Sequence, residues 1–119
     1  MNMTLYGIPN CDTVKKSRDW LAEHGCAYQF HDFKKDGLTK AQVDLWLQAV
    51  PWEVLVNKKG MTWRNLPDAT KAGVIDAASA TAVMLASPSV IKRPVLCHAK
   101  AVLVGFTADL YQQELEVAE

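Results

Sequence analysis

A single cysteine, Cys11, stands where a helix is expected to begin. A short apolar segment ends in the turn-forming sequence Gly7-Ile8-Pro9-Asn10, and Cys11 follows directly. The first turn of a helix carries unpaired N–H groups and partial positive charge, which favour an anionic thiolate over a neutral thiol. Cys11 is therefore the candidate nucleophile for attack on a disulfide or another electrophile. The alternative is an inert, buried cysteine.

The other two cysteines, Cys26 and Cys97, are expected to be structural. Cys26 lies beyond the far end of a predicted helix, about 20 Å from Cys11, whereas a disulfide needs Cα atoms within about 7 Å. Cys97 lies in a predicted strand, roughly 10 Å beyond Pro94. Cys11 is therefore predicted to act as a monothiol that needs an external thiol as its second partner.

The elements that position Cys11 begin with a β-α-β unit. Strands are predicted over residues 3–6 and 27–31, and a helix is predicted over residues 12–24 between them. Gly25 is expected to end this helix, because glycine is common just past a helix end. Such a unit makes two parallel neighbouring strands.

A helical insert of about residues 36–90 is expected next. Thr39 and Gln42 have the spacing of a capping box at the start of a helix. Residues 52–66 are expected to form a helical turn and a loop, and a further helix is predicted over residues 76–87. After the insert, the chain is expected to return to the sheet.

Two strands are predicted near the end of the chain, over residues 93–97 and 101–104, with His98-Ala99-Lys100 as a hairpin turn between them. Thr107 is expected to cap a final helix, where Phe106 and Tyr111 have the spacing of a hydrophobic staple.

The resulting order, β-α-β, helical insert, β-β-α, predicts an α/β fold. It is the order of a thioredoxin-like domain with a four-stranded mixed sheet, here a single domain over residues 1–119. Such folds hold a reactive cysteine after the first strand and a proline opposite it, before the third strand. Cys11 and Pro94 occupy those two places.

The composition narrows the function classes. Lys plus Arg number 13 and Asp plus Glu number 13, so charge gives no support for nucleic acid or an anionic membrane as the main partner. No secretory signal or bilayer-spanning segment is visible, and the cysteine count is odd, which favours a cytoplasmic protein with free thiols. The histidines and cysteines lack convincing metal-ligand spacing. Nothing in the sequence gives a reason to expect more than a monomer.

Four motifs in order resemble the ArsC/Spx family, and together they cover nearly the whole chain. They are Gly7–Lys16, Asn57–Arg64, Ile91–Leu96 and Val104–Phe106. The sequence looks most similar to the YffB-like branch, whose members are proposed to be glutathione-dependent thiol reductases.

The resemblance implies roles for individual residues. Cys11 matches the family's nucleophile, and Arg93 matches an arginine beside the active site. Pro94 matches a proline that is cis in this fold. The cis bond would expose the backbone of Arg93 to an extended substrate such as glutathione. No bound cofactor is implied. Asn10 and Thr13 are candidates for bonding the thiolate or, by preference, for capping the helix. Lys15 would add positive field near the thiol. The candidate substrate- or glutathione-binding residues are Asn10, Thr13, Lys15, Asn57, Arg64 and Pro94.

The sequence also departs from the arsenate reductases of this family. Those enzymes surround the oxyanion with three arginines, of which only Arg93 lines up, because Asn57 and Gly105 stand at the other two positions. Gly7 replaces a histidine. Two missing arginines weaken the case that the substrate is a multiply charged oxyanion, because the bidentate hydrogen bonds of arginine are hard to replace. A basic loop offers three possible substitutes: Lys58, Lys59 and Arg64.

The predicted function is a glutathione-dependent thiol-disulfide reductase. Its partners would be glutathione or a glutaredoxin, and its substrate a small-molecule or protein disulfide. Arsenate reduction by the same cysteine is one alternative. The other is a non-enzymatic regulator that binds a partner through the helical insert, as Spx-type proteins do. Spx-type proteins usually carry Cys-x-x-Cys, whereas here Val14 stands at the fourth position.

Overall fold

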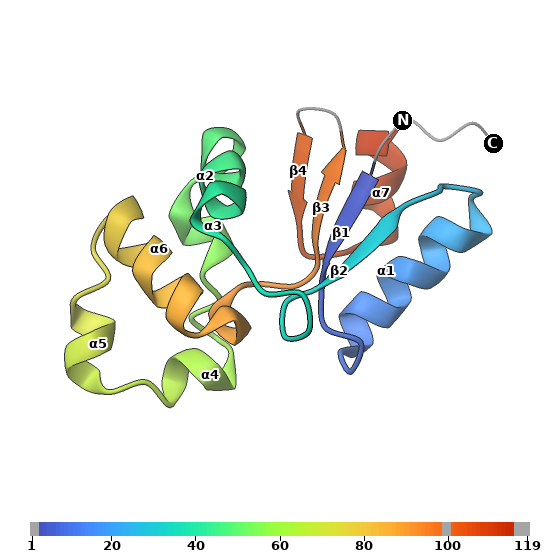
Figure 1. Ribbon diagram of the computed structural model, residues 1–119. Coiled ribbons are helices and arrows are strands. Elements are labelled where there is room, and N and C mark those ends of the chain that lie inside the picture. The colour runs from blue at the N-terminus through green and yellow to red at the C-terminus, as the bar shows by residue number, and fades with distance from the viewer. Residues whose placement is uncertain (1–2, 99–100, 116–119) are drawn as a thin grey trace. The chain divides into compact units, whose positions relative to one another are not determined.

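The computed structural model describes residues 3–98 and 101–115 (Figure 1). The chain divides into two compact units. The first unit consists of Met1–Asp36 and Arg93–Glu119, and the second consists of Gly37–Lys92. The second unit is the part of the chain in which the helical insert was expected, and the single domain stays a prediction.

The first unit contains a four-stranded mixed sheet, as the sequence predicted. The strands are β1 (Met3–Gly7), β2 (Gln29–Asp32), β3 (Val95–His98) and β4 (Ala101–Val104). Their order is β2-β1-β3-β4, with β1 parallel to β2 and the other pairs antiparallel.

β3 begins at Val95 and not at Arg93, because Pro94 has no N–H to donate to a neighbouring strand. The predicted hairpin turn at His98-Ala99-Lys100 involves residues 99–100, which lie outside the described residues.

Helices α1 (Asp12–Glu23) and α7 (Ala108–Leu115) pack on one face of the sheet (Figure 1). The shared core is apolar and consists of Leu5, Trp20, Leu21, Leu96, Leu103 and Tyr111. Inside this core the hydroxyls of Ser17 and Tyr111 hydrogen-bond at 2.7 Å, and the rings of Trp20 and Tyr111 meet edge to face at 5.5 Å. This packing fixes α1, and hence its first residue, against the sheet.

The predicted helix ends in the first unit are confirmed. Gly25 follows α1 with a φ of 67°, the left-handed conformation that glycine supplies at low cost. Thr107 Oγ1 accepts a hydrogen bond from the Leu110 N–H at 3.0 Å. The Phe106 and Tyr111 rings lie 4.8 Å apart, as a hydrophobic staple requires.

The second unit is helical. Its elements are α2 (Lys40–Ala49), α3 (Trp52–Leu55), α4 (Met61–Arg64), α5 (Asp68–Ala72), α6 (Ala77–Ala86) and a 3₁₀ turn at Pro88–Val90. Thr39 and Gln42 form the predicted capping box, and Asp76 forms a second box with Ser79. No pattern in the sequence predicted α5, because this helix has five residues and buries none of them.

Two extended segments of the second unit pair just before the chain returns to the sheet. Val56 and Ile91 form an isolated antiparallel bridge. The Lys92 N–H donates to the Leu55 carbonyl at 2.7 Å, and the Asn57 N–H donates to the Val90 carbonyl at 2.8 Å. These hydrogen bonds hold the backbone in place at the start of the basic loop that carries Lys58, Lys59 and Arg64.

Candidate active site at the start of helix α1

Cys11 is the N-cap residue of α1. Its backbone is extended, with φ −127° and ψ 124°, and its carbonyl accepts the first helical hydrogen bond from the Lys15 N–H at 2.9 Å. Its side chain is half-buried. An N-cap side chain is the one that normally accepts hydrogen bonds from the N–H groups of the first turn, so a thiolate at Cys11 is in the right position to use them.

The structure corrects the expected capping by Asn10 or Thr13. No side-chain hydrogen bond caps α1. Asn10 lies one residue before the N-cap position and is exposed, whereas Thr13 already lies inside the helix. Because the cysteine itself holds the N-cap position, neither neighbour can fill it. Their proposed contacts with the thiolate stay predictions.

The loop that carries Cys11 starts beside Pro94. β1 and β3 pair with Tyr6 opposite Val95, so one further step of the same register sets Gly7 opposite Pro94. The Arg93–Pro94 peptide bond is cis, as the resemblance implied. The Pro94 carbonyl accepts a hydrogen bond from the Gly105 N–H at 2.8 Å. This end of the sheet thus gathers the nucleophile's loop and the proline.

Gly7 has a steric role that the sequence did not reveal. A Cβ added to Gly7 would lie 2.9 Å from Val14 Cγ2, closer than real Cβ atoms come to other heavy atoms. Val14 is fully buried in the first turn of α1. Close packing of Val14 on Gly7 therefore sets how near the start of α1 comes to the end of β1. A histidine in place of Gly7 would therefore force Val14 and the start of α1 to move.

Gly105 has a comparable explanation. Its φ of 80° lies in the left-handed region, which side chains other than glycine rarely adopt. An arginine at this position would be strained. The backbone conformation therefore accounts for the absence of the family's third arginine.

The other cysteines lie away from the start of α1. The 12 residues of α1 separate Cys11 from Cys26, a rise of about 18 Å. The Cys26 thiol contacts the His24 carbonyl at 3.8 Å, and burial raises its pKa. Cys97 pairs with Thr4 in the sheet, three residues before Gly7 and so about 10 Å back along β1. None of these three cysteines, which all lie within the described residues, forms a disulfide.

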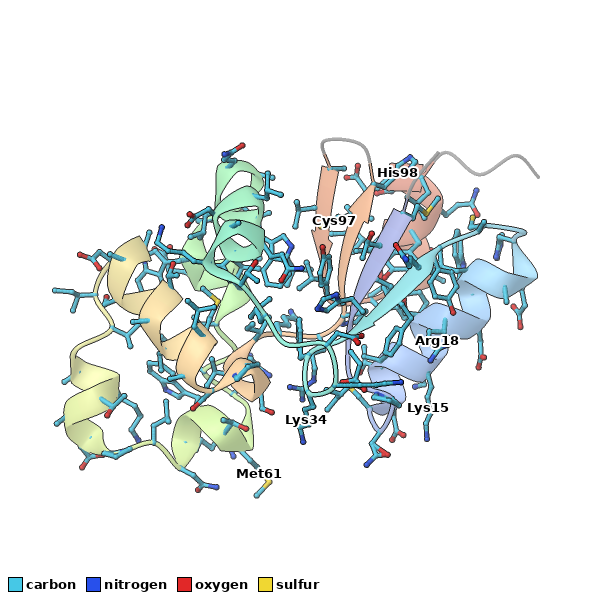
Figure 2. The ribbon with its side chains drawn as sticks, in the orientation of Figure 1. Lys15, Arg18, Lys34, Met61, Cys97 and His98 are labelled. Atoms are coloured by element: carbon cyan, nitrogen blue, oxygen red, sulfur yellow. The ribbon has the colours of Figure 1, made fainter. Side chains whose placement is uncertain are left out.

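Two cationic side chains of α1 differ in what they contact (Figure 2). Arg18 Nε donates to the Tyr28 hydroxyl at 2.9 Å, and its guanidinium lies 4.3 Å from the centre of the Phe30 ring. Arg18 therefore belongs to the packing of α1 on β2. Lys15 is exposed in the first turn of α1, and the positive charge that it would add near Cys11 stays a prediction. Arg93, in the same unit, is half-buried.

Asn57 and Arg64 lie in the second unit, and their roles toward Cys11 stay predictions. Asn57 Oδ1 accepts a hydrogen bond from the Lys59 N–H at 3.2 Å and so closes its own turn. The ammonium of Lys58 lies 5.5 Å from the centre of the Trp52 ring and 5.4 Å from that of Trp63. Arg64 ends α4 and is exposed.

Sequence reasoning missed two further residues of this loop region, Glu53 and Lys92. Both line a pocket with Asn57, Lys58 and Lys59. A signal for Lys92 was present, because it directly precedes Arg93 within one of the four motifs. Glu53 had no such signal, since it lies in α3, outside all four motifs.

Within residues 3–98 and 101–115, no group of three or more His, Cys, Asp or Glu residues is arranged to hold a metal ion. Nor does any helix in this part of the chain have the length and apolar character needed to cross a membrane.

The sheet, its helices and the cysteine at the start of α1 define a thioredoxin-like protein with a lone thiol. The ArsC family model matches residues 6–113. The chain therefore belongs to the ArsC family. The four-motif resemblance is thus confirmed at the family level.

Among its relatives, an uncharacterized protein of Haemophilus influenzae is 41% identical over 115 residues, covering 92% of this chain and 96% of the relative. The global transcriptional regulator Spx of Streptococcus agalactiae is 24% identical over 112 residues, covering 90% and 78%.

Two solved structures are more similar still in sequence. The YFFB (PA3664) protein is 46% identical, with a TM-score of 0.90, over 95% of this chain and 98% of the other. An arsenate reductase (ArsC) related protein from Brucella melitensis is 48% identical, with a TM-score of 0.75, over 98% and 96%. These similarities confirm the YffB-like, thioredoxin-fold assignment.

Proposed function

We propose that the protein is a glutathione-dependent thiol-disulfide reductase with Cys11 as its nucleophile. The observation that carries the proposal is the position of Cys11, which is half-buried and is the N-cap of α1. The loop that carries it begins at Gly7, opposite Pro94 by the strand register. A helix start stabilises the thiolate, which is the reactive form in disulfide exchange. The family resemblance to YffB-like proteins supplies the substrate class.

In the first step the Cys11 thiolate attacks one sulfur of a substrate disulfide. The substrate S–S bond breaks, a new S–S bond joins Cys11 to the attacked half, and the other half leaves as a thiolate that takes up a proton. Lys15 and Arg93 would favour the anionic reactant by their charge. The substrate would be a small-molecule or protein disulfide, including one that already contains a glutathione unit.

In the second step an external thiol must release Cys11. With glutathione on Cys11, a second glutathione thiolate attacks the glutathione sulfur, so that oxidised glutathione forms and the Cys11 thiolate returns. For a glutathione mixed disulfide, the net reaction therefore consumes one external glutathione, releases the other half of the substrate as a thiol and forms one oxidised glutathione. The distances of Cys26 and Cys97 support this route over an internal disulfide. We expect the reaction in a reducing cytoplasm, by a monomer without a bound cofactor and with glutaredoxin as an alternative thiol donor.

Arsenate reduction has weaker support. The second and third arginine positions hold Asn57, whose side chain closes its own turn, and Gly105, whose backbone disfavours any other residue. A multiply charged oxyanion would therefore have Arg93 and nearby lysines as its cations, without the bidentate arginine pairs that suit such an anion.

A partner-binding role like that of Spx is the second candidate, and one observation favours it. The exposed large hydrophobic side chains of the described residues all lie in the second unit: Leu45, Val54, Met61 and Ile75. Exposed apolar side chains are a common feature of protein–protein contacts. The two candidates differ in whether Cys11 is required.

A turnover assay with reduced glutathione tests the proposal, with a glutathione mixed disulfide and arsenate as parallel substrates. We expect turnover of the mixed disulfide by the wild type, none by Cys11→Ser, and little turnover of arsenate. Mass spectrometry after treatment with oxidised glutathione should show one adduct, on Cys11. Faster turnover of arsenate than of the disulfide would favour arsenate reduction, and no turnover of either would favour the partner-binding role.

A further inference from the structure

The second unit contains a pocket of about 400 Å³ whose wall is rich in lysine. This volume lies within the range of small-ligand sites. The residues that line it are Glu53, Val54, Val56, Asn57, Lys58, Lys59 and Lys92. All seven lie within Gly37–Lys92, so the pocket is complete within that unit.

The backbone on both sides of the pocket is fixed. The two hydrogen bonds between Leu55–Asn57 and Val90–Lys92, with the Val56–Ile91 bridge between them, hold Lys92 beside the turn that carries Lys58 and Lys59. A third bond, from the Gly60 N–H to the Asn57 carbonyl at 3.1 Å, closes that turn. Residues distant in sequence are thereby brought to one pocket.

The charges of the pocket are unequal. Three lysines line it but only one acidic residue, Glu53. The ammonium of Lys58 lies within 6 Å of two tryptophan rings, as cation–π contacts require, and is therefore held in place. Lys59 and Lys92 are exposed at the pocket. Such a site suits a ligand with two anionic groups and one cationic group.

We propose that this lysine pocket binds the carboxylates of glutathione, with the γ-glutamyl amino group toward Glu53. The inference rests on the proposed function and assigns the site that holds its thiol donor. Glutathione carries two carboxylates and one ammonium, which match the lysines and Glu53 in kind. An inorganic oxyanion would leave most of the pocket empty and would have no use for its apolar wall of Val54 and Val56.

Chain connectivity adds a second argument. Lys92 lines the pocket and is bonded directly to Arg93, which precedes the cis proline. Consecutive Cα atoms lie about 3.8 Å apart across a trans peptide bond. A ligand held at Lys92 is therefore held one residue along the chain from the residue that the family resemblance assigns to the active site.

The test replaces the two exposed lysines, Lys59→Gln and Lys92→Gln together. We expect the KM for glutathione to rise about tenfold, since two charge contacts are lost, with kcat unchanged. The matched control is Lys35→Gln with Lys40→Gln, two exposed lysines outside the pocket and outside the four motifs, which makes the same change in net charge. The control should keep the wild-type KM.

Two further arms separate the pocket from the chemistry. Turnover with 2-mercaptoethanol, which has no carboxylate, should be the same in the wild type and the pocket variant. Titration of Cys11→Ser with S-methylglutathione should shift the NMR amide signals of Asn57, Lys58, Lys59 and Lys92, and the diethyl ester should shift them far less.

These arms also distinguish the two possible failures. If the pocket variant keeps the wild-type KM for glutathione, and the titration leaves those signals unmoved, the pocket inference is wrong while the reductase function stands. If the wild type fails to turn over the disulfide with either glutathione or 2-mercaptoethanol, the proposed function is wrong. In that case, binding of S-methylglutathione in the titration would still support the pocket.

Discussion

Cys11 combines a favourable position with isolation from other thiols. Its place at the N-cap of α1 makes the thiolate accessible to the N–H groups of the first turn. The helix that provides this advantage also carries the chain about 18 Å away before Cys26 is reached. Reactivity and the need for an external thiol therefore have the same structural origin.

This isolation leads to a prediction for the cysteine variants. The double variant Cys26→Ser, Cys97→Ser should keep wild-type turnover with glutathione, because neither thiol can reach Cys11. Circular dichroism should show a native fold, and the glutathione adduct should still form. Loss of turnover in a folded double variant would show that one of the two cysteines resolves the mixed disulfide.

The contact between Gly7 and Val14 leads to a second prediction. Gly7→Ala should lower the free energy of unfolding by roughly 1–3 kcal/mol, because the new methyl group overlaps Val14. It should also change the rate at which iodoacetamide alkylates Cys11, since the start of α1 must move.

The double variant provides the control for this contact. Val14→Ala removes the atoms that the added methyl meets, so Gly7→Ala should cost less in the Val14→Ala background than in the wild type, with a coupling of about 0.5–3 kcal/mol. The double variant should also recover part of the wild-type alkylation rate. Strictly additive free energies would contradict the steric explanation.

At the scale of elements, α1 and α7 are joined by one buried polar contact. The hydroxyls of Ser17 and Tyr111 bond to each other inside an apolar core. Burial raises the pKa of Tyr111 to about 12, and its bond to Ser17 opposes this shift in part. The folded state therefore favours the neutral phenol.

The sign of the resulting pH dependence follows directly. The pKa of Tyr111 is higher in the folded protein than its ordinary value of 10.0, so its contribution to stability is complete below pH 10.0 and is lost as the pH rises toward 12. Tyr111→Phe should be less stable near neutral pH by about 1–3 kcal/mol, because the buried Ser17 hydroxyl loses its partner.

Urea unfolding across the alkaline range measures this effect. The stability difference between the wild type and Tyr111→Phe should narrow above pH 10.0. Adding Ser17→Ala to Tyr111→Phe should restore part of the loss at neutral pH, since no unpaired hydroxyl stays in the core. A difference that stays constant through the alkaline range would refute the assigned pKa.

At the scale of the molecule, the sequence predicted the features that depend on local patterns. The capping box at Thr39, the turn at Gly25 and the cap at Thr107 all depend on residues within a few positions of each other. The sheet followed from the order of the elements and from the resemblance. Helix α5 escaped prediction because it buries no side chain and so has no apolar stripe.

The candidate site was predictable in part, for a different reason. Cys11 and Pro94 could be placed from the fold, since both follow from strand order. The pocket at Lys92 could not, because its walls come from segments more than thirty residues apart in the chain that only backbone pairing brings together. Asn10 and Thr13 were misassigned as caps although the helix start was predicted correctly, because the residue directly before that start, Cys11, is itself the N-cap.

The side chain at position 14 has a consequence for the equilibrium of the reaction. Val14 stands three residues after the N-cap, where Cβ atoms lie about 5–6 Å apart, so a thiol there would be near enough to Cys11 to form an internal disulfide after modest adjustment. With valine, each oxidation of Cys11 by oxidised glutathione releases one glutathione. The fraction oxidised then depends on the first power of the glutathione to oxidised glutathione ratio, and diluting the whole pool leaves it unchanged. A dithiol would release two glutathione molecules for each disulfide formed, so its oxidised fraction would rise when the whole glutathione pool is diluted.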